Sequence, residues 1–108
     1  MKKGTLCYAD VPEGVGHEQK GTRPVIVVGE ANGLVTVIPL TTTLKRAKFS
    51  HTEIIEPSGE NGLREASVAL VFQIKSLDRS RIDGQIGVLS NEDMKRIDAL
   101  LRDLLGLM

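Results

Sequence analysis

A polar segment bounded by glycines, Gly16–Pro24, holds the residues best suited to chemistry. Glycines let the backbone turn tightly and approach a ligand closely, and Arg23 is followed by Pro24, whose ring restrains the local backbone. A guanidinium is a poor proton donor, but it presents a planar fork of donors to phosphate oxygens. Its expected role is therefore to stabilise negative charge at a reacting phosphate. On pattern alone, a solvated loop in which His17, Glu18 and Arg23 form a local ion pair is favoured over a site.

Three successive threonines, Thr41–Thr43, end a segment that has the composition of a strand. Their hydroxyls can donate hydrogen bonds to a phosphate or to a ribose 2′-oxygen. Because successive side chains of a strand point to opposite faces, at most two of the three are expected to share a site. Threonine is also a favourable strand residue, and for the triplet taken alone that ordinary role is favoured.

A third polar group, Gln73–Arg81, includes the cations Lys75, Arg79 and Arg81. The chain has 14 basic and 14 acidic residues, so binding to a polyanion would require a local patch of positive charge. These cations are one candidate for that patch, although acidic residues in the same stretch dilute it. An ordinary charged surface is the favoured interpretation of this stretch on its own.

The length of 108 residues predicts one domain spanning residues 1–108, and 41% hydrophobic and 26% charged residues are ordinary for a globular protein. Because Cys7 is the only cysteine, no intramolecular disulfide and no cysteine-based metal site are expected. His17 and His51 lack the partner spacing of a zinc site, so neither a metal nor a cofactor is expected. No apolar run reaches the ~18 residues of a membrane span, and no signal-peptide core follows Met1, so the expected location is a reducing cytoplasm.

Short strands must position these residues. The apolar run in Pro24–Val28 has no polar break, which is typical of a strand buried on both faces. Asn32 and Gly33 lie between two apolar runs and predict a tight hairpin. Strands are expected over Thr5–Asp10, Pro24–Val28, Leu34–Leu40, His51–Glu56, Ala66–Phe72 and Ile86–Leu89, with a loop over Val11–Thr22 and a turn over Pro57–Gly62.

The end of the chain has helical spacing instead. Ser90 and Asp93 resemble a capping box, and Gly106 stands where a C-terminal cap is expected. Five or six short strands followed by one amphipathic helix predict a mainly β fold with a C-terminal helix, either a strongly bent sheet or an SH3-like barrel. The apolar residues that recur on one helical face are Met94, Ile97, Leu100, Leu101, Leu104 and Leu105.

The segment Gly16–Val27 closely resembles the G-[HS]-E-Q-x-G-x-R-P signature of the MazF/PemK toxins. Other segments resemble that family in the same order: Gly4–Asp10 its opening strand, Pro39–Thr42 a strand that ends in threonine, and Ser67–Asp78 a segment of the form Q-[IV]-[RK]-[TS]-[IL]-D. The C-terminal helix fits as well. The resemblance therefore covers nearly the whole chain.

The resemblance implies an SH3-like barrel of the plasmid-maintenance-toxin (CcdB/PemK) fold and a two-fold homodimer. It implies an endoribonuclease toxin of a type II toxin–antitoxin system, an mRNA interferase that cleaves single-stranded RNA at short sequences without a metal. In that chemistry the neighbouring 2′-oxygen attacks, leaving 2′,3′-cyclic phosphate and 5′-hydroxyl ends. The implied partner is an antitoxin whose acidic tail covers the RNA groove, and the complex binds promoter DNA chiefly through the antitoxin.

The resemblance also assigns site residues. The catalytic arginine and threonine of the family correspond to Arg23 and Thr41, and His17 and Glu18 are expected to line the same groove. Further candidates for substrate binding are Gln19, Thr42, Ser67, Gln73 and Lys75.

The sequence departs from the family pattern in two places, which leaves open the residue that moves the proton and the cleavage specificity. Many relatives carry an acid where this chain has Phe72, so Glu18 or His17 would have to move the proton. His17 is the better base near neutral pH, because an unperturbed imidazole titrates at ~6.5. The turn over Glu30–Leu34 is shorter than in several relatives, which bears on cleavage specificity.

Two other functions compete with an active ribonuclease. Phe72 motivates the first, a catalytically inactive relative that only binds RNA or an antitoxin. The second is a gyrase-directed toxin on the same barrel, as in the CcdB branch, which the absence of tryptophan and the segment Glu18–Arg23 disfavour.

Overall fold

The computed structural model describes residues 1–11 and 21–107. Within this part of the chain, strands alternate with short 3₁₀ turns, and one α-helix ends the sequence. The elements are β1 (Thr5–Val11), β2 (Gly21–Ala31), β3 (Leu34–Thr41), η1 (Leu44–Lys48), β4 (Thr52–Ile55), β5 (Ser67–Leu70), η2 (Val71–Gln73), β6 (Lys75–Asp78), η3 (Arg79–Arg81), β7 (Ile82–Val88) and α1 (Asn91–Leu105).

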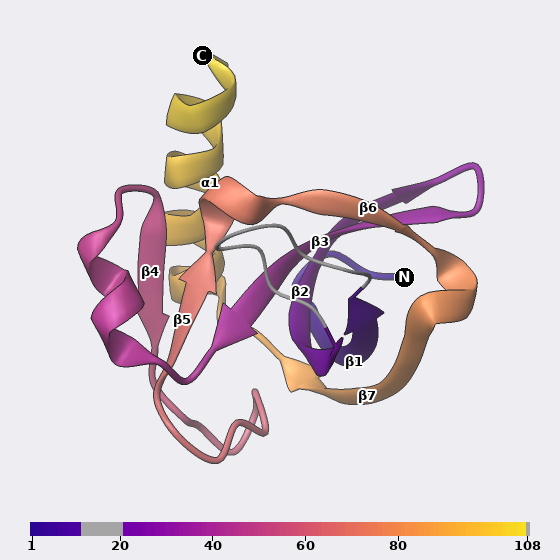
Figure 1. The fold of residues 1–108 in the computed structure, drawn as a ribbon, viewed down its shortest axis with the longest axis horizontal. Helices are drawn as coiled ribbons and strands as arrows, with labels where there is room; N and C mark the ends of the chain where they lie inside the picture. Colours follow the sequence, from indigo (N-terminus) through magenta and orange to yellow (C-terminus); the bar gives the residue numbers. More distant parts are fainter. Residues whose placement is uncertain (12–20, 108) are drawn as a thin grey trace.

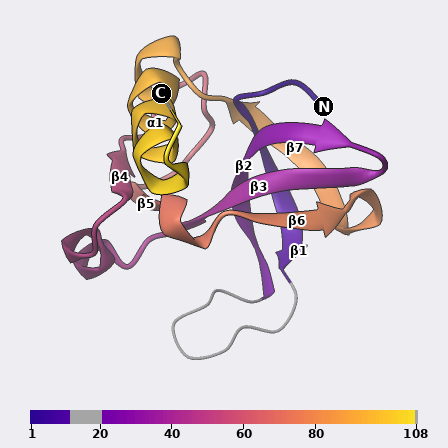
Figure 2. The ribbon, with the colours of Figure 1, turned by 90° about the horizontal axis from the view of Figure 1, so that it is seen from above.

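The strands form an antiparallel sheet that bends strongly around itself (Figure 1). Its order is β4-β5-β3-β2-β1-β7, and β6 also pairs with β3. The bend lies in β3, because its first half pairs with β6 and its end pairs with β5. The helix α1 lies against β4 and η2 at one end of the sheet (Figure 2). The predicted mainly β fold with a C-terminal helix is confirmed. A barrel is only a loose description, since β4 and β7 are not paired with each other in the described residues.

Two apolar cores lie on opposite faces of the central strands. In β2, Ile26 belongs to one core, whereas its neighbours Val25 and Val27 belong to the other. The helix α1 contributes Ile97 to the first core, and β6 contributes Leu77 to the second. The apolar run in β2 therefore lacks a polar break because it is buried on both faces, as predicted.

The β2–β3 hairpin has the predicted tight turn. Asn32 and Gly33 have φ angles of 54° and 80°, and positive values at both central residues are what a two-residue type I′ turn requires. The hairpin arms are not in one uniform register, because a bulge places Val28 of β2 as an extra residue between two cross-strand pairs. Such a bulge bends the strand and increases its twist.

The helix α1 begins and ends as predicted. The side chain of Ser90 accepts a hydrogen bond from the N–H of Asp93 at 3.1 Å. Gly106 is left-handed, with φ of 69°, and its N–H donates to carbonyls of the last turn. Ile97 is fully buried and fixes the inward face of the helix. No helix in the described ranges is long and apolar enough to span a membrane.

Some strand boundaries differ from the predictions. The strand expected over Ala66–Phe72 ends at Leu70, where the chain turns into η2. The short strand β6 was not predicted, because Leu77 is its only buried residue and charged neighbours obscure the alternation. The last strand spans Ile82–Val88 rather than Ile86–Leu89, since its first half is largely polar and exposed.

The loop between β4 and β5 is organised by Asn61, which is only 2% exposed. Its Oδ1 accepts hydrogen bonds from the N–H groups of Ser58 at 3.0 Å and Leu63 at 2.9 Å. Its Nδ2 donates to the carbonyl of Glu56 at 2.9 Å. One side chain thereby fixes the backbone of the turn that was predicted from Pro57–Gly62.

This loop packs directly on the backbone of β7. The N–H of Val88 donates to the carbonyl of Glu60 at 2.8 Å. A Cβ on Gly87 would lie 2.3 Å from that same carbonyl oxygen, and a Cβ on Gly62 would lie 2.5 Å from the carbonyl oxygen of Ile86. Glycine is therefore required at both positions of the contact, which holds the chain that leads into β5.

Candidate active site

The candidate site lies where β2 and β3 separate. The two strands stay paired from the hairpin as far as Val25, which lies opposite Pro39. Pro24 and Pro39 have no N–H to donate, so the ladder between the strands does not continue. Beyond this point β2 remains paired with β1, whereas β3 crosses to β5. Alternation keeps Arg23 on the face of Val25 and Thr41 on the face of Pro39, so both side chains face the space that opens.

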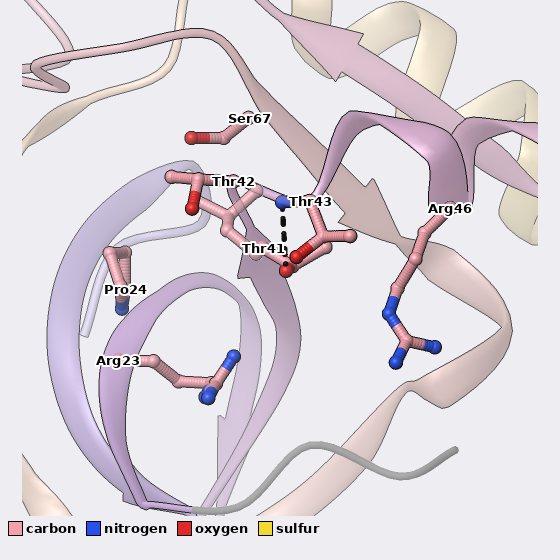
Figure 3. Close-up of a pocket in the computed structure, with 8 residues that line it drawn as sticks. Arg23, Pro24, Thr41, Thr42, Thr43, Arg46 and Ser67 are labelled. Atoms are coloured by element: carbon pink, nitrogen blue, oxygen red, sulfur yellow. Dashed lines mark hydrogen bonds between the residues drawn. The ribbon is translucent and has the colours of Figure 1, made fainter.

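A pocket of about 340 Å³ occupies this space. Figure 3 shows the two arginines on opposite sides of it, with the threonines between them. None of the described residues that line the pocket is acidic, so it presents positive charge and hydroxyl groups. These residues are Arg23, Pro24, Leu40, Thr41, Thr42, Thr43, Arg46 and Ser67. The structure thus brings together four predicted site residues: Arg23, Thr41, Thr42 and Ser67.

All three threonines line the pocket, so the prediction that at most two share a site is wrong. The alternation on which it rested stops at Thr41, where β3 ends and the chain bends towards η1. The N–H of Thr43 donates to Oγ1 of Thr41 at 3.2 Å and holds the bend (Figure 3). Because that oxygen accepts this bond, the hydroxyl hydrogen of Thr41 can be donated to a ligand.

Arg23 and Arg46 give the pocket its charge. Burial, and then the positive charge of Arg46, lower the pKa of the half-buried Arg23 guanidinium from its usual value. An arginine remains protonated near neutral pH even so, because its ordinary pKa lies above ~12. Two cations that share a pocket without a lining carboxylate create a potential that favours an anion.

Arg46 is the site residue that the sequence analysis missed. It lies in η1, immediately after the threonines. A signal was present, because Lys45, Arg46 and Lys48 place three cations within four residues with no acid among them. This cluster is denser than the one in Gln73–Arg81.

Comparison with known families decides the class of protein. Residues 2–105 match the sequence model of a family described as a PemK-like, MazF-like toxin of type II toxin-antitoxin system. The chain belongs to the PemK/MazF toxin family. It is 33% identical over 113 residues to Endoribonuclease EndoA of Bacillus subtilis (strain 168), an alignment that covers 99% of this chain and 96% of that relative. The predicted family and enzyme class, an endoribonuclease, are therefore confirmed.

Solved structures agree with this assignment. The toxin resembles the crystal structure of MazF from Deinococcus radiodurans with a TM-score of 0.79 and 30% identity, over 99% of this chain and 97% of that one. It also resembles the MazE–MazF crystal structure from the same organism with a TM-score of 0.74 and 26% identity, over 100% of this chain and 97% of that one. The PemK/MazF fold expected from the sequence is thereby confirmed.

A second, smaller pocket adjoins the first in the PemK/MazF toxin. It encloses about 120 Å³ and shares Pro24, Thr42 and Ser67 with the larger pocket. It adds Tyr8, which is 44% exposed. Ser67 is only 3% exposed, and its hydroxyl donates to the carbonyl of Glu65 at 3.1 Å, so it fixes the wall between the two pockets.

The other predicted site residues of the toxin fall into two groups. His17, Glu18 and Gln19 lie outside the described residues. Gln73 and Lys75 are described, but they do not line the Arg23 pocket. Gln73 is buried in η2 with 8% exposure, and Lys75 is the half-buried first residue of β6.

Phe72, which stands where many relatives carry an acid, packs against another aromatic ring in this toxin. The ring of Phe72 packs edge to face against Phe49, with the centroids 5.8 Å apart and the planes at 63°. The Nε2 atom of His51 lies 2.7 Å from a carboxylate oxygen of Asp103 on α1, and neither residue lines the pocket. No carboxylate or imidazole is therefore among the described residues that line the Arg23 pocket.

Two of the three cations in Gln73–Arg81 form ion pairs. Arg79 forms an ion pair with Glu30, and Arg81 forms one with Asp10 at 3.2 Å. Its interpretation as an ordinary charged surface is confirmed for these two arginines. The described residues that line the Arg23 pocket include two arginines and no acid.

Residues with other possible chemistry lie apart from the pocket. Across residues 1–11 and 21–107, no three His, Cys, Asp or Glu side chains form a group that could hold a metal ion. Cys7 is fully buried in the second core, and burial raises the pKa of its thiol. A buried thiol of this kind is a poor nucleophile near neutral pH.

Proposed function

We propose that this PemK/MazF toxin cleaves single-stranded RNA at short specific sequences, without a metal ion or a cofactor. The observation that carries the proposal is the meeting of Arg23 and Thr41, from two strands, in one hydroxyl-lined pocket whose described residues include no acid. A guanidinium and hydroxyl donors match the oxygens of a phosphodiester. The similarity to Endoribonuclease EndoA supports RNA as the polymer.

In the proposed reaction a base takes the proton of a ribose 2′-hydroxyl, and the 2′-oxygen attacks the adjacent phosphorus. The bond from phosphorus to the 5′-oxygen then breaks, and that oxygen takes a proton. The products are a 2′,3′-cyclic phosphate and a 5′-hydroxyl. Arg23 stabilises the negative charge that develops on the phosphoryl oxygens, and Thr41 donates a hydrogen bond to one of them.

The proton is moved by His17 or Glu18, since the described lining residues provide no base. His17 is better suited near neutral pH. Flanking nucleotides are bound by the remaining predicted residues: Gln19, Thr42, Ser67, Gln73 and Lys75.

The proposed activity is tested by cleavage of a long single-stranded RNA in excess EDTA. Purified protein is expected to cut at discrete sites and to leave 5′-hydroxyl and 2′,3′-cyclic phosphate ends, because no step requires a metal. A 2′-deoxyribose placed at a mapped site is expected to block the cut there, since it removes the attacking oxygen. Cutting that requires an added divalent cation, or that survives the 2′-deoxyribose, would refute this chemistry.

A catalytically inactive relative is the second candidate. It is favoured by Phe72 and by the lack of a carboxylate or imidazole among the described lining residues. Tight RNA binding by well-folded protein with no cleavage at any pH would support it. In that case Phe72→Glu would be the first variant to assay for recovered cleavage.

The hydroxyl of Thr41 is tested by Thr41→Val, which keeps the shape of the side chain and removes the donor. We expect kcat/KM for RNA cleavage to fall about 100-fold, the scale seen when one donor to a developing charge is removed. Thr41→Ser retains the hydroxyl and is expected to keep most of the activity. The Val variant also loses the acceptor for Thr43 N–H, at about 1 kcal/mol of stability, which thermal unfolding measures separately. Equal activity losses in both variants would contradict a role for the hydroxyl.

The same proposal extends to the partners. An antitoxin with an acidic tail would cover the cationic pocket. The MazE–MazF structure from Deinococcus radiodurans supports an antitoxin as partner. Promoter DNA would be bound by the toxin–antitoxin complex chiefly through the antitoxin. A homodimer is supported by apolar surface at the end of α1, where Leu105 and Leu107 are 54% and 60% exposed. The site of action would be the cytoplasm, as a single toxin domain over residues 1–108.

A further inference from the structure

The short helix η1 joins the Arg23 pocket to a second cationic pocket. Arg46 lines both: the first with Arg23 and the threonines, and the second, of about 230 Å³, with Lys45, Lys48 and Phe49. Positive charge therefore continues from the candidate active site along η1 instead of ending at Arg23. An extended polyanion could occupy both pockets at once.

The geometry of η1 spreads its cations over the surface. A 3₁₀ helix has three residues per turn, so Lys45 and Lys48 lie in one row and Arg46 lies in the next. No residue of η1 is buried, and Arg46 itself is half-buried. A hydrogen bond joins the helix to the threonine segment, because Arg46 N–H donates to the Thr43 carbonyl at 3.0 Å. At the other end of η1, Phe49 N–H donates to the Arg46 carbonyl at 3.1 Å.

The second pocket offers charge rather than a stacking surface. The Nζ atom of Lys48 lies 5.6 Å from the centroid of the Phe49 ring and covers one of its faces. The same ring packs against Phe72. A nucleobase would have to displace these contacts to stack, whereas a phosphate group can approach the ammonium groups directly.

Three other arginines have a different electrostatic environment from Arg46. Arg79, Arg81 and Arg96 each contact a carboxylate in the described structure. Arg46 instead shares its pocket with a second guanidinium and with no lining acid. Two like charges in one pocket raise the free energy of the empty protein, and an anion relieves that repulsion.

We propose that Arg46 binds the RNA phosphate next to the one that is cleaved, and that Lys45 and Lys48 extend this contact along the backbone. This inference rests on the proposed function, in which Arg23 and Thr41 hold the scissile phosphate. Arg46 therefore sets affinity and the position of the strand, while Arg23 stabilises the reacting group. Carboxylates of an acidic peptide are the competing occupant of the same charges.

The test compares Arg46→Gln with Arg102→Gln, which removes the same charge from an exposed position on α1. Binding is measured by fluorescence anisotropy at several salt concentrations, with an RNA that carries 2′-deoxyribose at the mapped cut site. Arg46→Gln is expected to weaken binding about tenfold and to reduce the slope of log affinity against log salt by about 0.7, the value for one phosphate contact on a single strand. Arg102→Gln is expected to match the wild type in both measurements.

Kinetics on cleavable RNA give an independent readout. Arg46→Gln is expected to raise KM about tenfold with kcat nearly unchanged, because the lost contact is made equally in the bound and transition states. A wild-type affinity and salt slope in Arg46→Gln, with normal cleavage by the wild type, would overturn this inference and leave the proposed function standing. The inference is equally overturned if Arg46→Gln loses binding only to an acidic peptide.

Failure of the proposed function would look different. Wild-type protein that cuts no RNA contradicts the catalysis, and the binding comparison is then made with all-ribose RNA. A reduced slope in Arg46→Gln would still support a phosphate contact, and an unchanged slope would refute it.

Discussion

Arg23→Ala is expected to lower kcat/KM for RNA cleavage by about 10²–10³-fold or more while leaving the protein folded. In the proposed reaction the Arg23 guanidinium meets charge on the phosphoryl oxygens, and the neighbouring hydroxyls cannot replace its positive charge. Folding is expected to persist, because Arg23 is half-buried near the start of β2 and belongs to neither core. Initial rates in EDTA and thermal unfolding of the same preparation measure the two effects separately.

Arg23→Lys is the matched control for charge. Lysine keeps the positive charge but loses the planar fork of donors, so an activity between those of alanine and arginine is expected. If Arg23→Ala cuts at the wild-type rate, the role given to Arg23 is wrong. If Arg23→Lys is fully active, charge alone suffices and the fork has no special part.

Gly87→Ala is expected to destabilise the fold by about 3 kcal/mol, at the upper end of the usual cost of overpacking. The new Cβ would lie 2.3 Å from the carbonyl oxygen of Glu60 and 2.5 Å from the carbonyl carbon of Asn61, and neither backbone atom can move aside as a flexible side chain would. Urea unfolding would show a lower midpoint with an unchanged slope. Because the displaced loop leads into β5, Ser67 and the pocket wall are expected to lose order as well.

Gly84→Ala provides the control within the same strand. No atom lies within 4 Å of a Cβ at this position. Its expected effect on the free energy of unfolding is within about 0.5 kcal/mol, as for most exposed substitutions. Similar destabilisation by both variants would show that loss of glycine in β7, and not the close approach to the loop, is responsible.

The parts of the fold that were predictable have causes within a few residues. The turn at Asn32 and Gly33 requires positive φ angles, and the caps at Ser90 and Gly106 satisfy groups at the ends of one helix. The strand β6 depends instead on a distant partner, because the bend in β3 leaves its first half open for pairing. Local sequence carries no trace of that bend.

The candidate site likewise combines features with local causes and features that depend on residues distant in the sequence. Arg23 and Thr41 were predicted one by one, from a polar segment and from a family resemblance, but their meeting results from the separation of two strands. Arg46 was missed because η1 was not expected, and only its position after the bend turns a basic surface residue into a pocket residue. The pattern of Gln73–Arg81 does not reveal that two of its cations are neutralised by acids far away in the sequence.

The bulge at Val28 shifts the register of the β2–β3 hairpin by one residue. On the turn side of it, Gly29 lies opposite Thr36, whereas on the pocket side Val27 lies opposite Val37. If Val28 were paired with Val37 instead of being bulged, every later partner would move by one, and the face that Arg23 shares with Thr41 would be shared with Thr42 instead. The bulge thus decides which face of β3 lies on the same side of the sheet as Arg23. A one-residue insertion in β3 between the bulge and the pocket would shift the same pairing without changing any residue of the pocket.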